Sequence, residues 1–206
     1  LAGQDSGSPG AKPEVKGVEM SDLKSVLADM TTKMNKAVDV AKEDFASIRT
    51  GRAHPGMFAK IMVDYYGTLT PLAQLASVQV PEARTALVTP FDKGAMANIE
   101  KAIRESDLGV NPGNDGGVIR VNFPQLTEER RKEYIKVARN KAEESRVSLR
   151  NIRRNAKEAM EKMEKDGLIG KDDLARAEKD MEKATSDHVA KIDEILKHKE
   201  AELLEV

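Results

Sequence analysis

The sequence predicts an α+β protein: a long antiparallel three-helix bundle into which a small β/α/β domain is inserted on a two-strand hinge. Charged residues make up 33% of the 206 residues and aromatic residues only 3%, which favours long helices over a large sheet-built core. Apolar residues recur at helical spacing in three segments. Between the first two segments the pattern changes to short β-like runs that are broken by glycine and proline.

The first helical segment is expected to begin at Ser21 as its N-cap and to belong to a bundle formed by residues 20–49 and 126–206. Its apolar positions alternate in steps of four and three: Leu23, Leu27, Met30, Met34, Ala37, Ala41, Phe45 and Ile48. Such a stripe is buried against neighbouring helices. Residues 1–19 are rich in Gly, Pro and Ser and lack the apolar core of a signal peptide. We expect them to be a disordered leader or an appended segment.

Residues 50–125 are expected to form the inserted domain. The runs KIMVDYY (60–66), SVQV (77–80), TALVTPF (85–91) and VIRVNF (118–123) predict strands, and KGAMANIEKAIRES (93–106) predicts an amphipathic helix. The glycine-rich NPGNDGG (111–117) lacks the GK[ST] of a phosphate-binding loop and is expected to be a turn. The chain crosses between domains twice, and the expected hinge residues are Gly51, Arg52, Pro55, Asn122, Pro124 and Arg131.

The second and third helices have readable ends. Thr127 is expected to cap the second helix, which then runs about 39 residues, or roughly 58 Å, to a stop before Gly167. Asp172 and Asp173 are expected to open the third helix. A helix of this length indicates a rod.

The middle of the second helix is strongly basic. Residues 139–157 carry seven basic and two acidic side chains. When residues advance by about 100° each, the cations fall on one flank, about 40–140° from Leu149, where only Glu143 offsets them. This basic flank consists of Arg139, Arg146, Arg150, Arg153, Arg154 and Lys157. It favours binding of an extended polyanion such as RNA. The alternatives are pairing of individual arginines with acids on the third helix, and a coiled-coil scaffold whose partners are other helices.

The sequence offers little for catalysis. The three histidines have no metal-ligand spacing, there is no cysteine, and no nucleophile–base pair supports a hydrolase in the inserted domain. We therefore expect no enzyme, no cofactor and no metal site. No apolar run approaches the ~20 residues of a membrane span, and a cysteine-free chain fits a reducing cytoplasm.

Five blocks of the sequence resemble ribosome recycling factor, a bacterial family. They are RTGRAHP (49–55), DYYGTLTPLAQLASV (64–78), SDLGVNP (106–112), IRVNFPQLTEERRKE (119–133) and VSLRNIRRNAKE (147–158). The resemblance extends in order from about residue 21 to the C-terminal KHKEAELLEV. Asp64 stands where the family often has Glu, and Asn122 and Gln125 stand where prolines are common.

This resemblance implies a tRNA-like, two-domain translation factor. Such a factor binds the large subunit of the post-termination 70S ribosome and, with elongation factor G and GTP, splits it into subunits, which releases mRNA and tRNA. The family's rRNA contacts correspond here to Arg150, Arg153 and Arg154, with Arg130 and Arg131 near the hinge. Together with the basic flank, the expected rRNA-binding residues are Arg130, Arg139, Arg146, Arg150, Arg153, Arg154 and Lys157. We expect a cytoplasmic monomer without a membrane partner.

Overall fold

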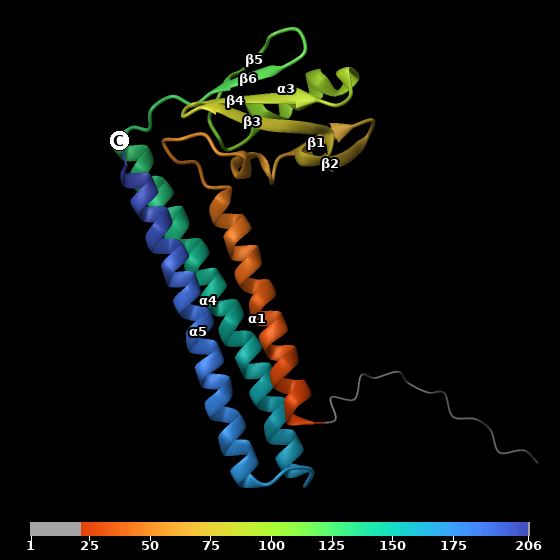
Figure 1. Ribbon diagram of the computed structural model, residues 1–206, viewed down its shortest axis with the longest axis vertical. Coiled ribbons are helices and arrows are strands. Elements are labelled where there is room, and N and C mark those ends of the chain that lie inside the picture. Colours follow the sequence, from red (N-terminus) through yellow and green to blue (C-terminus); the bar gives the residue numbers. More distant parts are fainter. Residues whose placement is uncertain (1–21, 206) are drawn as a thin grey trace, which may run out of the picture.

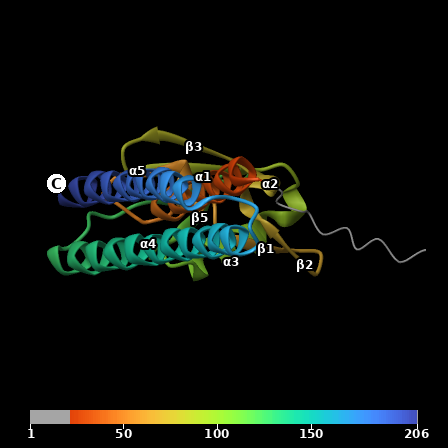
Figure 2. The same cartoon turned by 90° about the horizontal axis from the view of Figure 1, so that it is seen from below.

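The computed structural model describes residues 22–205, which form a rod of three helices with a small mixed domain across one end (Figure 1). The rod consists of α1 (Leu23–Ala46), α4 (Glu128–Lys165) and α5 (Lys171–Leu204). The helix α4 is antiparallel to α1 and α5, and all three pack against one another (Figure 2). The predicted α+β class, with a three-helix bundle and an inserted sheet domain, is confirmed.

The first helix begins one residue later than the sequence predicts. The side chain of Asp22 is the N-cap and accepts a hydrogen bond of 2.7 Å from the backbone N–H of Ser25. A carboxylate in this position satisfies a free N–H and opposes the positive end of the helix dipole. The expectation of Ser21 as the cap is therefore wrong. Ser21 itself and the expected leader lie outside the described residues.

The ends of the two long helices match the prediction. The hydroxyl of Thr127 accepts a 3.2 Å hydrogen bond from the N–H of Arg130, and α4 continues for 38 residues. Gly167 follows with φ of +73°, the left-handed conformation in which glycine costs least at a helix end. Asp172 and Asp173 lie in the first turn of α5. No helix within residues 22–205 combines the length and apolar character that a membrane span requires.

The apolar stripes of the three helices form one continuous core along the rod. Its largest buried side chains include Met30, Met34, Phe45, Leu149 and Met160. The core also holds a polar residue that the apolar pattern did not indicate. His188 of α5 is buried, and its ring nitrogens lie 2.6 Å from the carbonyl oxygen of Ala184 and 2.8 Å from Oδ1 of Asn35 on α1.

The inserted domain contains two antiparallel sheets. A hairpin joins β1 (Met62–Tyr65) to β2 (Thr68–Pro71), and a second sheet has the order β3-β4-β6-β5, formed by Ala76–Glu82, Thr85–Pro90, Ile119–Asn122 and Pro112–Asn114. The helix α3 (Met96–Glu105) contacts β1 and β5. The short helices η1 (Pro55–Phe58), α2 (Leu72–Leu75) and η2 (Lys93–Ala95) complete the domain. Its core is separate from that of the bundle.

Two strands of the inserted domain differ from the sequence-based expectation. Residues 112–114, predicted to be a turn, form β5 because they pair with β6, a contact between residues that local patterns do not reveal. The strand β2 was also not predicted. It follows Tyr66 and Gly67, whose φ angles of +49° and +84° place both in the left-handed region. This conformation matches a two-residue turn of the tight hairpin type.

The core of the rod gives a first prediction. Leu149 lies in the middle of α4 with none of its surface exposed, so Leu149→Ala should lower the free energy of unfolding by about 2–5 kcal/mol, through lost burial and a residual cavity. The measurement is chemical denaturation followed by circular dichroism. Val147→Ala is the control, because Val147 is 44% exposed on the same helix and should change stability by less than about 0.5 kcal/mol. Equal effects of the two variants would contradict this description of the core.

Candidate nucleic-acid interface

The basic flank of α4 lies beside α5 for much of its length. Because the two helices are antiparallel, positions further along α4 meet positions earlier in α5. The pairs are Arg139–Glu200 at 2.6 Å, Arg146–Asp193 at 2.6 Å, Arg153–Glu182 at 3.4 Å and Lys157–Glu178 at 3.9 Å. These four contacts form a ladder of ion pairs that connects the second and third helices.

Glu143 offsets two arginines of the flank at once. Its carboxylate accepts hydrogen bonds from Arg150 and from Arg146, the latter at 3.2 Å, and these bonds hold the pKa of Glu143 below its usual value. Arg146 also contacts Asp193, and this hydrogen bond raises the pKa of the Arg146 guanidinium. Arg146 is thus the most completely paired arginine of the flank.

The expectation that this flank carries uncompensated positive charge is therefore wrong. On α4 itself Glu143 lies beside these cations, whereas four further acids approach from α5: Glu178, Glu182, Asp193 and Glu200. Their positions depend on the register between two helices, which the spacing along one helix does not contain. The alternative of pairing with the third helix applies to Arg139, Arg146, Arg153 and Lys157.

Arg154 differs from the other candidate cations. It is exposed, and no carboxylate within residues 22–205 lies within 4.0 Å of its guanidinium. It belongs to the outer edge of the flank, about 140° from the core position Leu149. At the start of α4, Arg130 pairs with Glu133 on its own helix at 3.1 Å.

The ion pairs around Arg154 are open to solvent. The side chains of Arg150 and Arg153 are 52% and 38% exposed, and that of Glu182 is 59% exposed. Exposed pairs of this kind typically stabilise a fold by only about 0–1 kcal/mol, so a competing phosphate can take over the guanidinium. The group Arg150, Arg153 and Arg154 therefore remains chemically able to bind a polyanion.

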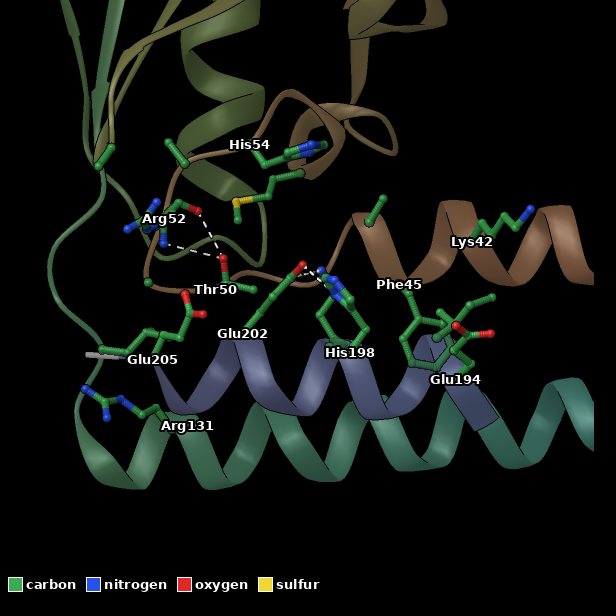
Figure 3. A pocket seen from close by; sticks show the side chains of 18 of the residues that line it. Lys42, Phe45, Thr50, Arg52, His54, Arg131, Glu194, His198, Glu202 and Glu205 are labelled. Atoms are coloured by element: carbon green, nitrogen blue, oxygen red, sulfur yellow. Dashed lines mark hydrogen bonds and ion pairs between the residues drawn. The ribbon is translucent and has the colours of Figure 1, made fainter. Parts of the chain in front are cut away.

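A cleft of about 1410 Å³ separates the end of the bundle from the inserted domain (Figure 3). It is lined by the first crossing, by Lys42 and Phe45 of α1, and by Glu194, His198 and Glu202 of α5. Figure 3 shows the His198–Glu202 pair, 3.0 Å apart, and the turn in which the backbone N–H of Arg52 donates to the hydroxyl of Thr50.

Three of the six expected hinge residues line this cleft. Gly51, Arg52 and Arg131 line it, and within residues 22–205 the guanidinium of Arg131 has no hydrogen bond or ion pair. Pro55 begins η1, and the carbonyl of Pro124 accepts a hydrogen bond from Arg49. Asn122 belongs to strand β6 instead of the second crossing, and its side chain accepts a 3.2 Å hydrogen bond from Thr85.

Arg49 is a functional candidate that the sequence analysis missed. It lies three residues beyond α1 and is 6% exposed, and its guanidinium donates to the carbonyls of Leu108 at 2.8 Å and Pro124 at 2.6 Å. The signal available in the sequence was its position directly after Ile48, the last residue of the apolar stripe. An arginine at that point has to lie near the joint between the domains.

Comparison with known proteins supplies the family. The model of the family described as Ribosome recycling factor matches residues 41–204. This chain belongs to the ribosome recycling factor family. The ribosome-recycling factors of Streptomyces avermitilis and Kineococcus radiotolerans are each 64% identical over 184 residues, which cover 89% of this chain and 100% of each relative. Members of this family act in ribosome recycling and translation termination.

Solved structures of the family have the same architecture. A solution structure of the ribosome recycling factor is 38% identical with a TM-score of 0.70, covering 89% of this chain and 98% of that one. Models of the T. thermophilus ribosome recycling factor and E. coli elongation factor G, bound to the E. coli post-termination complex, give 43% identity and a TM-score of 0.63. That match covers 89% of this chain and 99% of the other.

The ladder between α4 and α5 gives a second prediction. Asp193→Asn removes a carboxylate from Arg146, yet Arg146 keeps Glu143 and both partners are partly solvated. The melting temperature should therefore change by less than about 4 °C, as measured by thermal unfolding with circular dichroism. A much larger fall would show that the ladder is required for the fold and cannot exchange its carboxylates for phosphates.

Proposed function

We propose that this protein binds the post-termination ribosome and, together with elongation factor G and GTP, splits it into subunits and so releases mRNA and tRNA. The observation that carries the proposal is the family match over residues 41–204. A relative with 43% identity is described as bound to the post-termination complex with elongation factor G. Because its target is the ribosome, the proposed place of action is the cytoplasm.

The proposed contact with large-subunit rRNA centres on Arg150, Arg153 and Arg154. Guanidinium groups bind phosphate oxygens in a bidentate manner, and these three lie within two turns on an exposed part of the rod. Arg154 is available as it stands, whereas Arg150 and Arg153 exchange weak ion pairs for phosphates. The other expected contacts, Arg130, Arg139, Arg146 and Lys157, also have carboxylate partners. Arg146 contributes least in this proposal, because its side chain is only 26% exposed and two carboxylates hold it.

The proposed mechanism is mechanical and involves no bond chemistry by this chain. The rod is anchored on rRNA through phosphates, which position a protein without reading sequence. The inserted domain is joined to the rod by two crossings, so a partner can displace it without releasing the anchor. GTP hydrolysis belongs to elongation factor G, and this chain uses no cofactor of its own.

A coiled-coil scaffold is the rival function, and the structure favours a monomer instead. The apolar stripes of α1, α4 and α5 are buried against one another within one chain. A scaffold would need an apolar stripe left free for other helices. Light scattering during size-exclusion chromatography distinguishes the two, because a scaffold forms larger assemblies as concentration rises.

The rRNA contact gives a third prediction. Arg154→Gln should weaken binding to large ribosomal subunits by about 3–10-fold near 0.1 M salt and reduce the salt dependence by about one phosphate contact. Filter binding across a salt series measures both quantities. Arg176→Gln is the matched control, because this exposed arginine at the start of α5 pairs with Asp173 and lies outside the flank. Identical losses in the two variants would remove Arg154 from the proposed site.

The splitting activity gives a fourth prediction. Purified protein with elongation factor G and GTP should convert post-termination 70S ribosomes into subunits, followed by the fall in light scattering. The control uses a GTP analogue that cannot be hydrolysed, with which splitting should stop. Ribosome binding without any splitting, under conditions where a known family member is active, would contradict the proposal.

A further inference from the structure

We infer that Arg49 is a positioning residue for ribosome recycling. From the first crossing it binds Pro124 in the second crossing and Leu108 in the loop after α3, and these contacts, called the clasp below, set the orientation of the inserted domain on the rod. The effect on recycling rests on the function proposed above. The effect on orientation does not, because it follows from contacts within the chain.

Arg49 connects three segments that are far apart in the sequence. It belongs to the first crossing, and Nη1 donates to the carbonyl of Leu108 in the loop after α3. Nη2 donates to the carbonyl of Pro124 in the second crossing, and the guanidinium carbon lies 5.6 Å from the ring centre of Phe123. A rotation of the inserted domain about its crossings therefore has to disturb this one side chain.

The loop after α3 lies against the bundle at Gly109 and Asp107. Gly109 has φ of +62°, and a Cβ built on it would lie 3.6 Å from Nη1 of Arg49. The neighbouring carbonyl of Asp107 accepts a second, longer contact of 3.4 Å from the hydroxyl of Tyr134 on α4. Two bundle-side residues thus hold adjacent carbonyls of the same loop, and Arg49 makes the shorter contact.

The hydrogen bonds of Arg49 to the carbonyls of Leu108 and Pro124 orient the inserted domain and can still be broken when it moves. Arg49 is buried without a carboxylate partner in the described residues, and burial lowers the pKa of its guanidinium. A buried ion pair would be hard to break, because separation leaves an uncompensated charge on each side. Backbone carbonyls are neutral, so when the domain turns away only the guanidinium is left as a charge that has to regain hydrogen bonds from water or other carbonyls.

One donor of Arg49 remains unused in this orientation. Its Nε is buried and has no hydrogen-bond partner in the described residues. A buried N–H without an acceptor is unfavourable. Within residues 22–205, Nε of Arg49 is the one buried side-chain donor that this orientation leaves without an acceptor.

The experiment measures the inter-domain distance in the full-length chain. The natural sequence contains no cysteine, so Ser148→Cys on α4 and Gln79→Cys on β3, both exposed, take a specific pair of fluorescent labels. Arg49→Met removes the charge and all donors at similar length. Arg49→Lys keeps the charge but loses the fork that reaches two carbonyls at once. Arg120→Met, an exposed arginine of the inserted domain that pairs with Asp115, is the control.

Single-molecule energy transfer should show a distance distribution at least about twofold broader in Arg49→Met than in the natural sequence, because the domain samples more orientations. Arg49→Lys should fall between the two, and Arg120→Met should match the natural sequence. Tyr134→Phe, which removes only one hydroxyl, should broaden the distribution slightly and keeps the test available if Arg49→Met does not fold.

The functional measurement separates binding from splitting. Ribosome affinity of Arg49→Lys should stay within about twofold, because the rod is untouched, while the rate of splitting at saturating factor should fall by about tenfold. Unchanged distance distributions in both Arg49 variants would overturn the clasp. A broadened distribution with normal splitting would overturn its role in recycling. If the natural sequence itself fails to split ribosomes, the proposed function fails, and the distance measurement still decides the clasp.

Discussion

The structure depends on the mutual burial of three apolar helix stripes along a rod. A helix of 38 residues is far too long to be stabilised by a compact core at one point, so α4 needs apolar partners over its whole length. The helices α1 and α5 supply them, and the residues between α1 and α4 fold as a separate domain at one end (Figure 1). The same packing makes the rod stiff, which the proposed mechanical role requires.

The rod also determines what its charges can do. Close packing of α4 on α5 places carboxylates of one helix beside cations of the other, and this turns most of the basic flank into ion pairs. These pairs are solvated and therefore exchangeable. Arg154, on the outer edge, remains without a carboxylate in the described part of the chain. The proposed RNA interface therefore centres on Arg150, Arg153 and Arg154, with Arg154 as the cation that needs no exchange of partner.

The joint between the domains is held by hydrogen bonds, whereas each domain core is held by apolar burial. The apolar side chains of the bundle and of the inserted domain form two separate clusters, so few apolar contacts fix their relative orientation. Hydrogen bonds from Arg49 to two backbone carbonyls take over this task. Such directional hydrogen bonds specify the angle between the two domains, and they can be replaced by hydrogen bonds to water when the domains move. A continuous apolar core would have joined the two domains into one rigid body.

Five blocks of residues carry the resemblance to the family. The sequence also indicated the three long helices, α3 and the caps at Thr127 and Gly167. These features are encoded by local spacing and turn chemistry, which neighbouring residues carry between them. It also indicated the arginines of α4. The three-dimensional packing shows that acids of α5 pair with Arg139, Arg146 and Arg153, that residues 112–114 pair as a strand, and that Arg49 connects the domains. Each of these depends on which distant segments meet, and helix register and strand pairing are set by packing in space, not by periodicity along the chain.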